Sequence, residues 1–206
     1  MAIELWFLIL FTCLLGAVSP GPSLFCVIQS VKDGGRASGC LAAIAHAFGV
    51  FLWAAVTLFG LDYLITKNDA FRSGIAILGA IYLLHLSFRI LADRSKAIEE
   101  ISVASPKTKL SSARDGFMIS LLNPKLAIFF TALFSQFLVY SPTVLEKALM
   151  ATLAAVVDGL WYALVALCVS YPTFRELLFV HDRKVSIASA FVFIIVAMQV
   201  MFNVLT

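Results

Sequence analysis

The chain has 206 residues, of which 62% are hydrophobic and 13% charged, and its mean hydropathy is +1.00. This composition excludes an ordinary soluble globular protein. We therefore predict an all-α integral membrane protein.

Six apolar stretches are long enough to cross about 30 Å of hydrocarbon as helices of about 20 residues each. They cover residues 4–28, 37–61, 71–91, 116–139, 144–170 and 186–205. Almost nothing is left for a soluble domain, so we expect one transmembrane domain over residues 1–206. The first stretch does not have the basic start or the small-residue cleavage site of a signal peptide.

The first span contains Ser19-Pro20-Gly21-Pro22 inside its apolar run. Each proline removes a backbone donor and its ring clashes with the preceding turn, so the helix must be broken here. Hydrocarbon offers no water to the freed backbone groups, and such a break persists only if it is buried in protein or lines a cavity. The break therefore predicts a substrate site.

Two further spans complete the first half of the chain. The turn at Lys32-Asp33-Gly34-Gly35-Arg36 is short, so the spans on either side of it should be antiparallel neighbours. The second span is rich in small residues, and its one ionisable residue, His46, is a candidate for a functional role; the alternative is a packed histidine bonded to a carbonyl. In the third span, Tyr82 lies one helical turn from His85 and could face the same way.

The second half repeats this plan after a polar segment, about 92–115, which we interpret as a cytoplasmic linker. The fourth span contains Asn123-Pro124-Lys125 inside its apolar run, so this helix is also interrupted. At about 1.5 Å per residue, both breaks lie about 10 Å from the cytoplasmic end of their span and could meet. Three spans headed by a broken helix, followed by three more, indicate two inverted repeats over about 1–91 and 116–206.

Lysine and arginine are concentrated in the loops after the first, third and fifth spans. The positive-inside rule makes these loops cytoplasmic and places both termini on the non-cytoplasmic side. The net charge of +3 is explained by this topology and does not require a nucleic-acid partner.

Asp158 and Lys125 are charged residues well inside their spans. On insertion scales a central Lys or Asp costs about 2.5 to 3.5 kcal/mol, so each is a functional candidate. The alternative for Lys125 is that its long side chain reaches the cytoplasmic surface, and for Asp158 a structural ion pair with Lys125. Asp158 is the stronger candidate because its side chain is too short to reach the surface.

These groups together suit a zwitterion such as a small α-amino acid. A broken helix offers N–H groups and a positive dipole end on one side of the break and carbonyls on the other. The N–H groups, supplemented by Ser19, Ser23 or Asn123, could bind the carboxylate, and carbonyls or Asp158 could bind the ammonium group. Asp158 could also take up a proton in one state and release it in another, which predicts proton antiport.

In this order and spacing, the motifs make the chain similar to the LysE/RhtB family of bacterial amino-acid exporters along nearly its whole length. The shared motifs are Ser19-Pro20-Gly21-Pro22, Gly34-Gly35-Arg36, Gly79-Ala80-Ile81-Tyr82-Leu83-Leu84, Gly116-Phe117, Asn123-Pro124-Lys125, Phe134-Ser135-Gln136-Phe137, and Asp158 with Trp161 and Tyr162. The resemblance implies an inner-membrane exporter of amino acids or close derivatives, with no cofactor and no enzymatic activity. Gln136, with Tyr82 and His46, is a further candidate for the pathway.

Other functions have less support in the residues. A metal-cation exporter would need converging ligands, and only Asp158, His46 and His85 are available. A thiol–disulfide relay would need a cysteine at each broken helix, and the fourth span has none. A non-transporting scaffold protein would not explain the two helix breaks. An enzyme would need a nucleophile–base pair, and none is apparent in the sequence. Whether the chain forms a homo-oligomer stays open.

Overall fold

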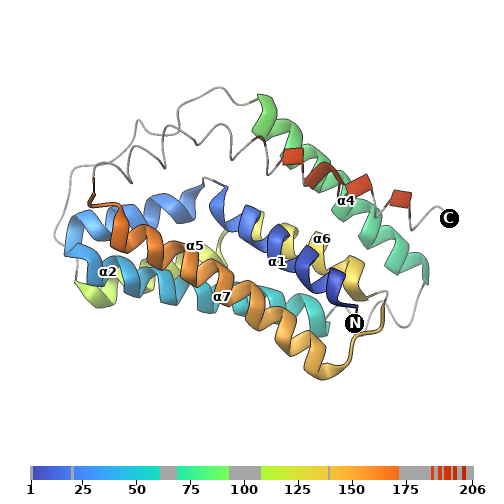
Figure 1. Cartoon of the computed structure of the whole chain (residues 1–206), viewed down its shortest axis with the longest axis horizontal. Helices are drawn as coiled ribbons and strands as arrows, with labels where there is room; N and C mark the ends of the chain where they lie inside the picture. The colour runs from blue at the N-terminus through green and yellow to red at the C-terminus, as the bar shows by residue number, and fades with distance from the viewer. Residues whose placement is uncertain are drawn as a thin grey trace.

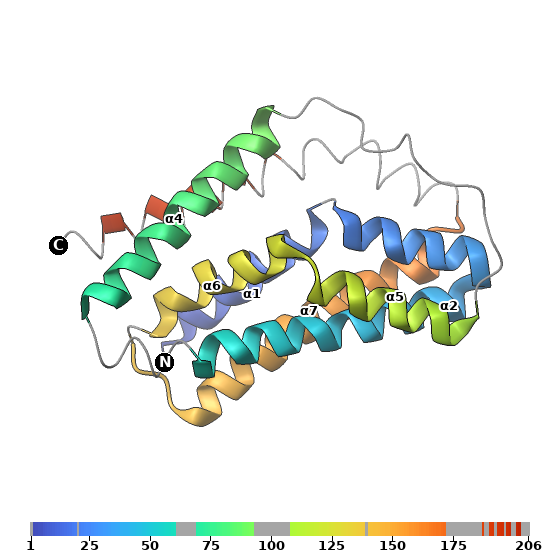
Figure 2. The same cartoon turned by 180° about the vertical axis from the view of Figure 1, so that it is seen from behind.

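The computed structural model describes residues 2–19, 21–60, 69–92, 108–138 and 140–171, together with single positions between 187 and 202. Every regular element in these ranges is a helix. The helices run mostly along the long axis of the molecule and pack side by side (Figures 1 and 2). The prediction of an all-α protein is therefore confirmed.

The first span is broken where the prolines predicted it. Helix α1 covers Ile3–Val18, and helix α2, Pro22–Ala55, begins after an extended segment in which Ser19 has φ −61° and ψ 121° and Gly21 has φ −175° and ψ −176°. Pro22 occupies the first turn of α2, where its missing N–H leaves no intrahelical bond unmade. Pro20 lies outside the described residues.

Helix α2 turns back on itself at Gly35. This residue has φ 76° and ψ 177°, a backbone conformation that side chains with a Cβ rarely adopt. Both views show the two parts of α2 running in opposite directions from this point (Figures 1 and 2). The returning part ends in a π-helix, η1, Val56–Gly60. The predicted short turn between antiparallel neighbours is therefore present.

The remaining spans follow their predicted ranges closely. Helix α4 covers Asp69–Ala92 and helix α7 covers Val144–Cys168. Helix α7 begins with a capping box, in which Thr143 accepts from the Glu146 backbone and the Glu146 carboxylate accepts from the Thr143 N–H at 2.8 Å. The described positions of the last predicted span, between Ile187 and Phe202, are helical.

The fourth span is broken between helix α5, Lys109–Leu121, and helix α6, Pro124–Leu138. The chain bends by 55° at this break. The helix begins before the predicted apolar span: α5 starts at Lys109, inside the expected linker, because the Thr108 hydroxyl caps it by accepting from Ser111 N at 3.2 Å. With 13 residues in α5 at about 1.5 Å each, the break lies about 20 Å from the start of this helix.

Small residues allow α2 to pack closely against α5 and α7. Gly49 faces Ser120 of α5, and Gly159 of α7 faces Ala47. Gly116 of α5 lies directly against the backbone of Ala42, so that a methyl group added there would overlap the carbonyl. Such contacts bring backbones together where the bilayer provides no hydrophobic driving force between helices.

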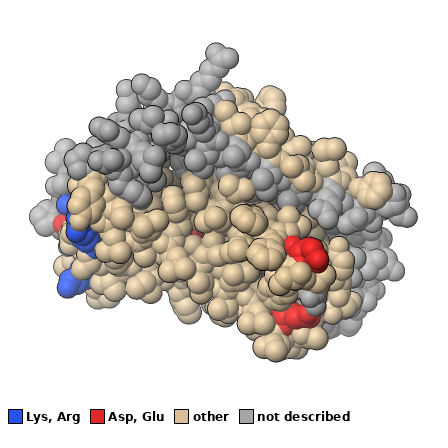
Figure 3. Space-filling model, viewed as in Figure 1, with Lys and Arg blue, Asp and Glu red and all other residues tan. Residues whose placement is uncertain are grey.

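The outer surface of the described helices is apolar and the charges lie at its ends. Two helical stretches, Pro22–Gly60 and Val144–Cys168, are long and apolar enough to cross a membrane, and α5 with α6 makes a third if the bent pair is one span. On the face shown in Figure 3, lysine and arginine gather at one end of the long axis, and the larger acidic patches lie at the other. The described part of the chain therefore has the surface of a membrane protein.

We predict that Gly116→Ala lowers the thermal stability of the purified protein in detergent. The added methyl group must push α5 away from α2, and overpacking of this kind costs about 1 to 3 kcal/mol. The matched control is Gly74→Ala on α4, where an added Cβ meets no atom within 4 Å. Equal melting temperatures for the two variants would show that the close approach of α2 and α5 is absent.

Candidate functional site

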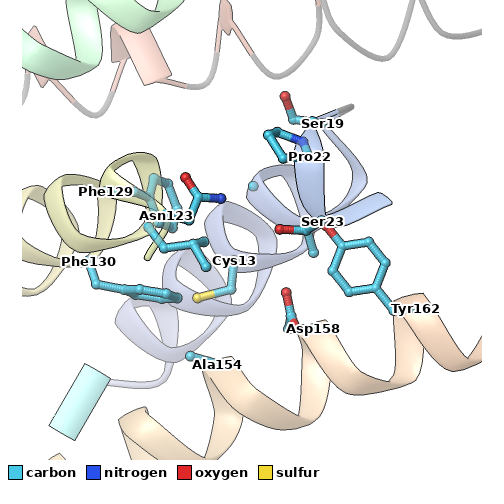
Figure 4. A pocket seen from close by; sticks show the side chains of 14 residues that line it. Cys13, Ser19, Pro22, Ser23, Asn123, Phe129, Phe130, Ala154, Asp158 and Tyr162 are labelled. Atoms are coloured by element: carbon cyan, nitrogen blue, oxygen red, sulfur yellow. The ribbon is translucent and has the colours of Figure 1, made fainter. Parts of the chain in front are cut away.

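Residues from both helix breaks line one pocket (Figure 4). The first break contributes Ser19, Gly21, Pro22 and Ser23, and the second contributes Asn123. The other lining residues are Cys13, Gly16 and Ala17 of α1, Leu126, Phe129 and Phe130 of α6, and Ala154, Asp158 and Tyr162 of α7. The structure thus brings together two breaks that lie about a hundred residues apart in the sequence.

The pocket has a polar side and an apolar side. The Asp158 side chain points from α7 toward Ser23 and the first break, and Asn123 approaches from the second break (Figure 4). Cys13, Phe129 and Phe130 form an apolar wall of the same pocket. The enclosed space is narrow, with room for about one or two water molecules, so a larger ligand requires the surrounding helices to move apart.

A chain of hydrogen bonds runs behind this pocket from Ser23 through His46 to Asp158. His46 Nδ1 lies 2.7 Å from Asp158 Oδ2, and His46 Nε2 lies 2.8 Å from Ser23 Oγ. All three side chains are buried, and His46 is only 1% exposed. The Tyr162 ring packs edge-on against the imidazole, with centroids 5.0 Å apart and planes at 78°. His46 is therefore fixed by three neighbours on two helices.

The pairing determines how protons are arranged when Asp158 is ionised. The carboxylate can only accept, so Nδ1–H of His46 donates to it, and Nε2 of the neutral ring then accepts from the Ser23 hydroxyl. Serine hydrolases use the same order of groups. No nucleophile–base pair was expected from the sequence, whereas the folded chain places Ser23 Oγ within hydrogen-bond distance of His46 Nε2.

Trp53 supplies a partner for the second break. Its indole Nε1–H donates to Ser120 O at 3.2 Å and to Leu121 O at 3.3 Å. These carbonyls belong to the last turn of α5, where no further helical N–H is available to bond them. Trp53 could not be connected with this break from the sequence, beyond the need of a buried indole for an acceptor.

Most of the predicted site residues whose side chains the structure describes lie in or beside the shared pocket. Ser19, Gly21, Pro22, Ser23, Asn123 and Asp158 line the shared pocket, and His46 lies directly behind it. The expected carbonyl partner of His46 was wrong, because both ring nitrogens bond side chains. Gln136 bonds Ala132 O of its own helix at 3.0 Å and does not line the pocket.

Other predicted site residues have side chains that the structure does not describe. The side chains of Tyr82, Pro124 and Lys125 lie outside the described residues, as does all of Pro20. Asp158 pairs with His46, which accounts for its burial without the ion pair to Lys125 considered above. Within the described ranges no three His, Cys, Asp or Glu side chains converge as a metal site.

Apolar lining residues were missed by sequence reasoning. Cys13, Phe129, Phe130 and Ala154 lie in long apolar runs in which a pocket-lining side chain looks the same as one that faces lipid or core. Only the fold distinguishes pocket-lining side chains from the others, because lining the pocket requires that their face of the helix is turned toward the breaks.

Comparisons with known proteins match the sequence of this chain to a transporter family. The sequence model of the LysE type translocator matches residues 14–204. The chain is 28% identical to the threonine efflux protein of Escherichia coli over 163 residues, covering 77% of this chain and 79% of that protein. It is 33% identical to the leucine efflux protein of Klebsiella pneumoniae over 135 residues, covering 62% of each.

A threonine efflux protein of Salmonella typhi is 26% identical over 176 residues, covering 84% of this chain and 85% of that protein. No solved structure matches the chain. Members of this family are transporters and not enzymes. The match spans both helix breaks and Asp158, and the chain belongs to the LysE type translocator family.

Proposed function

We propose that this protein exports amino acids or close derivatives from the cytoplasm in exchange for protons. The observation that carries the proposal is the single pocket in which two helix breaks meet a buried carboxylate. The names of the relatives, threonine and leucine efflux proteins, support a small amino acid as the cargo.

The pocket offers both charges of an amino acid a partner. The backbone bond from Phe25 N to Gly21 O at 3.3 Å lies in the first turn of α2, and the N–H groups of Ser23 and Leu24 belong to the same turn, at the positive end of the helix. These donors and the positive end of the helix dipole favour a carboxylate. The Asp158 carboxylate, which lines the same pocket, favours the ammonium group.

The apolar wall supports a neutral cargo side chain. Phe129 and Phe130 of α6 and Cys13 of α1 would face that side chain when the two charged groups of the amino acid are bound at the breaks. A cationic side chain would lose its hydration there without a second carboxylate among the described lining residues.

We further propose that the chain forms two inverted three-helix repeats, over about 1–91 and 116–206, with six spans. Pro22 and Pro124 each begin the helix that follows a break. The third and sixth spans bury residues in the same order: Ala80, Leu83 and Ser87 correspond to Ala190, Phe193 and Ala197. This agreement supports the same arrangement of helices in both repeats. Movement of one repeat against the other would open the narrow pocket.

The proposed location is the bacterial inner membrane, with both termini on the non-cytoplasmic side. The basic end of the molecule would then face the cytoplasm (Figure 3). In this orientation the turn at Gly35 is cytoplasmic, and Arg36 in that turn lies 4.8 Å from the Tyr171 ring centroid at the end of α7.

Asp158→Asn should abolish proton-driven export. The amide cannot exchange a proton in this way, and it loses most of the attraction for a substrate ammonium group. We expect uphill export of threonine or leucine from proteoliposomes, driven by a pH gradient, to fall at least about tenfold, which corresponds to about 1.4 kcal/mol. Glu4→Gln, on the exposed first turn of α1, is the control. Undiminished gradient-driven export by Asp158→Asn would remove this residue from the mechanism.

Asn123→Ala should weaken substrate binding while leaving the fold intact. A lost hydrogen bond to a charged group costs about 1.5 to 3 kcal/mol, so we expect the KM for exchange to rise about tenfold or more. The control is Thr131→Val on α6, whose hydroxyl bonds Ala127 O of its own helix at 2.8 Å and does not line the pocket. Equal KM values for the two variants would exclude Asn123 from the binding site.

A further inference from the structure

We propose that His46 is a positioning residue that carries the exchanged proton together with Asp158 and transmits its presence to the first broken helix through Ser23. The inference rests on the proposed function and identifies the His46 imidazole as the group that makes amino-acid exchange depend on protons. Its basis is the continuous hydrogen-bonded chain of three buried side chains.

The chain joins three parts of the fold that must move relative to one another for the pocket to open. Ser23 lies in the first turn after the break, His46 lies on the returning part of α2, and Asp158 lies on α7. His46 contacts Ser23 and Asp158 at 2.8 and 2.7 Å, so its two ring nitrogens link the other two residues directly. A change at either nitrogen therefore reaches both the break and the carboxylate.

Adding one proton reverses one of these hydrogen bonds. In the proton-free state the Ser23 hydroxyl donates to Nε2, and Nδ1–H donates to Asp158. When a proton binds to Nε2, both ring nitrogens are donors, and Ser23 Oγ must accept where it previously donated. The Ser23 hydroxyl hydrogen then turns away from the ring, and the first turn after the break presents a different pattern of donors.

The same proton changes the charge that a substrate meets. With a neutral ring, the carboxylate of Asp158 carries an uncompensated negative charge beside the pocket, which favours an ammonium group. With an imidazolium 2.7 Å away, that charge is balanced, and the attraction for the ammonium group is weakened. Proton and substrate therefore compete for one carboxylate, which is the requirement for exchange in opposite directions.

Other titratable groups surround this pair. Tyr162 of α7 packs against the imidazole, Cys13 of α1 is close enough to Asp158 to interact electrostatically, and Cys26 of α2 lies near Tyr162. Thiols and phenols ordinarily titrate above about pH 8, so measurements below about pH 7.5 avoid the titration of these groups.

The test compares His46→Gln and Ser23→Ala with the wild-type chain in proteoliposomes. Threonine and leucine are the probes, measured as exchange at equal pH on both sides and as uphill export driven by a pH gradient. The control is Ser38→Ala, a buried serine of α2 whose hydroxyl bonds Gly34 O at 2.9 Å and does not line the pocket.

For His46→Gln we expect the ratio of gradient-driven export to equal-pH exchange to fall at least tenfold, and the pH dependence of exchange to flatten. For Ser23→Ala, which leaves the His46–Asp158 pair in place, we expect the pH profile of exchange to shift, while Ser38→Ala keeps the wild-type ratio and profile. If His46→Gln does not fold, as judged by size-exclusion chromatography, the pH profile of exchange in Ser23→Ala tests the proposal instead.

The proposed role of His46 would be overturned if His46→Gln kept the wild-type ratio of gradient-driven export to equal-pH exchange and the wild-type pH profile. An unshifted pH profile of exchange in Ser23→Ala would also overturn it. Neither result would contradict proton exchange itself. A wild-type chain that moves no amino acid, or that moves one without regard to the pH gradient, would instead contradict the proposed function. Release of about one proton when threonine or leucine binds to the wild-type protein in detergent, and its loss in His46→Gln, gives an independent readout that does not depend on transport.

Discussion

Backbone groups that lie in hydrocarbon must find partners within the protein, and this constraint explains most of the architecture. Two proline-containing breaks, ending at Pro22 and Pro124, interrupt helices in the apolar part of the chain. Breaks of this kind persist only where the fold buries them or turns them toward a cavity. The chain satisfies this requirement by bringing the two breaks to one pocket, with Trp53 bonded to the carbonyls at the end of α5.

The same packing that holds the breaks together also creates the chemistry of the site. Close contacts at Gly49, Gly116 and Gly159 bring α2 against α5 and α7 and place His46 between Ser23 and Asp158. A buried carboxylate would be costly without a partner, and the imidazole supplies one that can also change its charge. Stability and the proposed proton exchange thus depend on the same side chains.

Much of the fold could be predicted from the sequence because membrane helices obey simple rules. Proline chemistry located both breaks, and Gly35 predicted the turn within α2. The beginning of α5 was missed because the cap at Thr108 lies in a polar segment whose composition is typical of a linker. For the site, Asp158 stood out as a charge in an apolar span. The partner of His46 could not be predicted, since the contact joins residues 112 positions apart and depends on how α2 turns back against α7.

The most direct test of the central claim, that the two broken helices meet at one pocket, is cross-linking between α1 and α6 in native membranes. An added Cβ at Gly16 lies 2.9 Å from the Phe129 ring. A chain without its four native cysteines that carries Gly16→Cys and Phe129→Cys should therefore be cross-linked rapidly by a short bifunctional thiol reagent. A pair with Phe11→Cys, on the exposed face of α1, in place of Gly16→Cys should react far more slowly. Equal rates for the two pairs, or no cross-link at Gly16, would contradict the shared pocket on which the account depends.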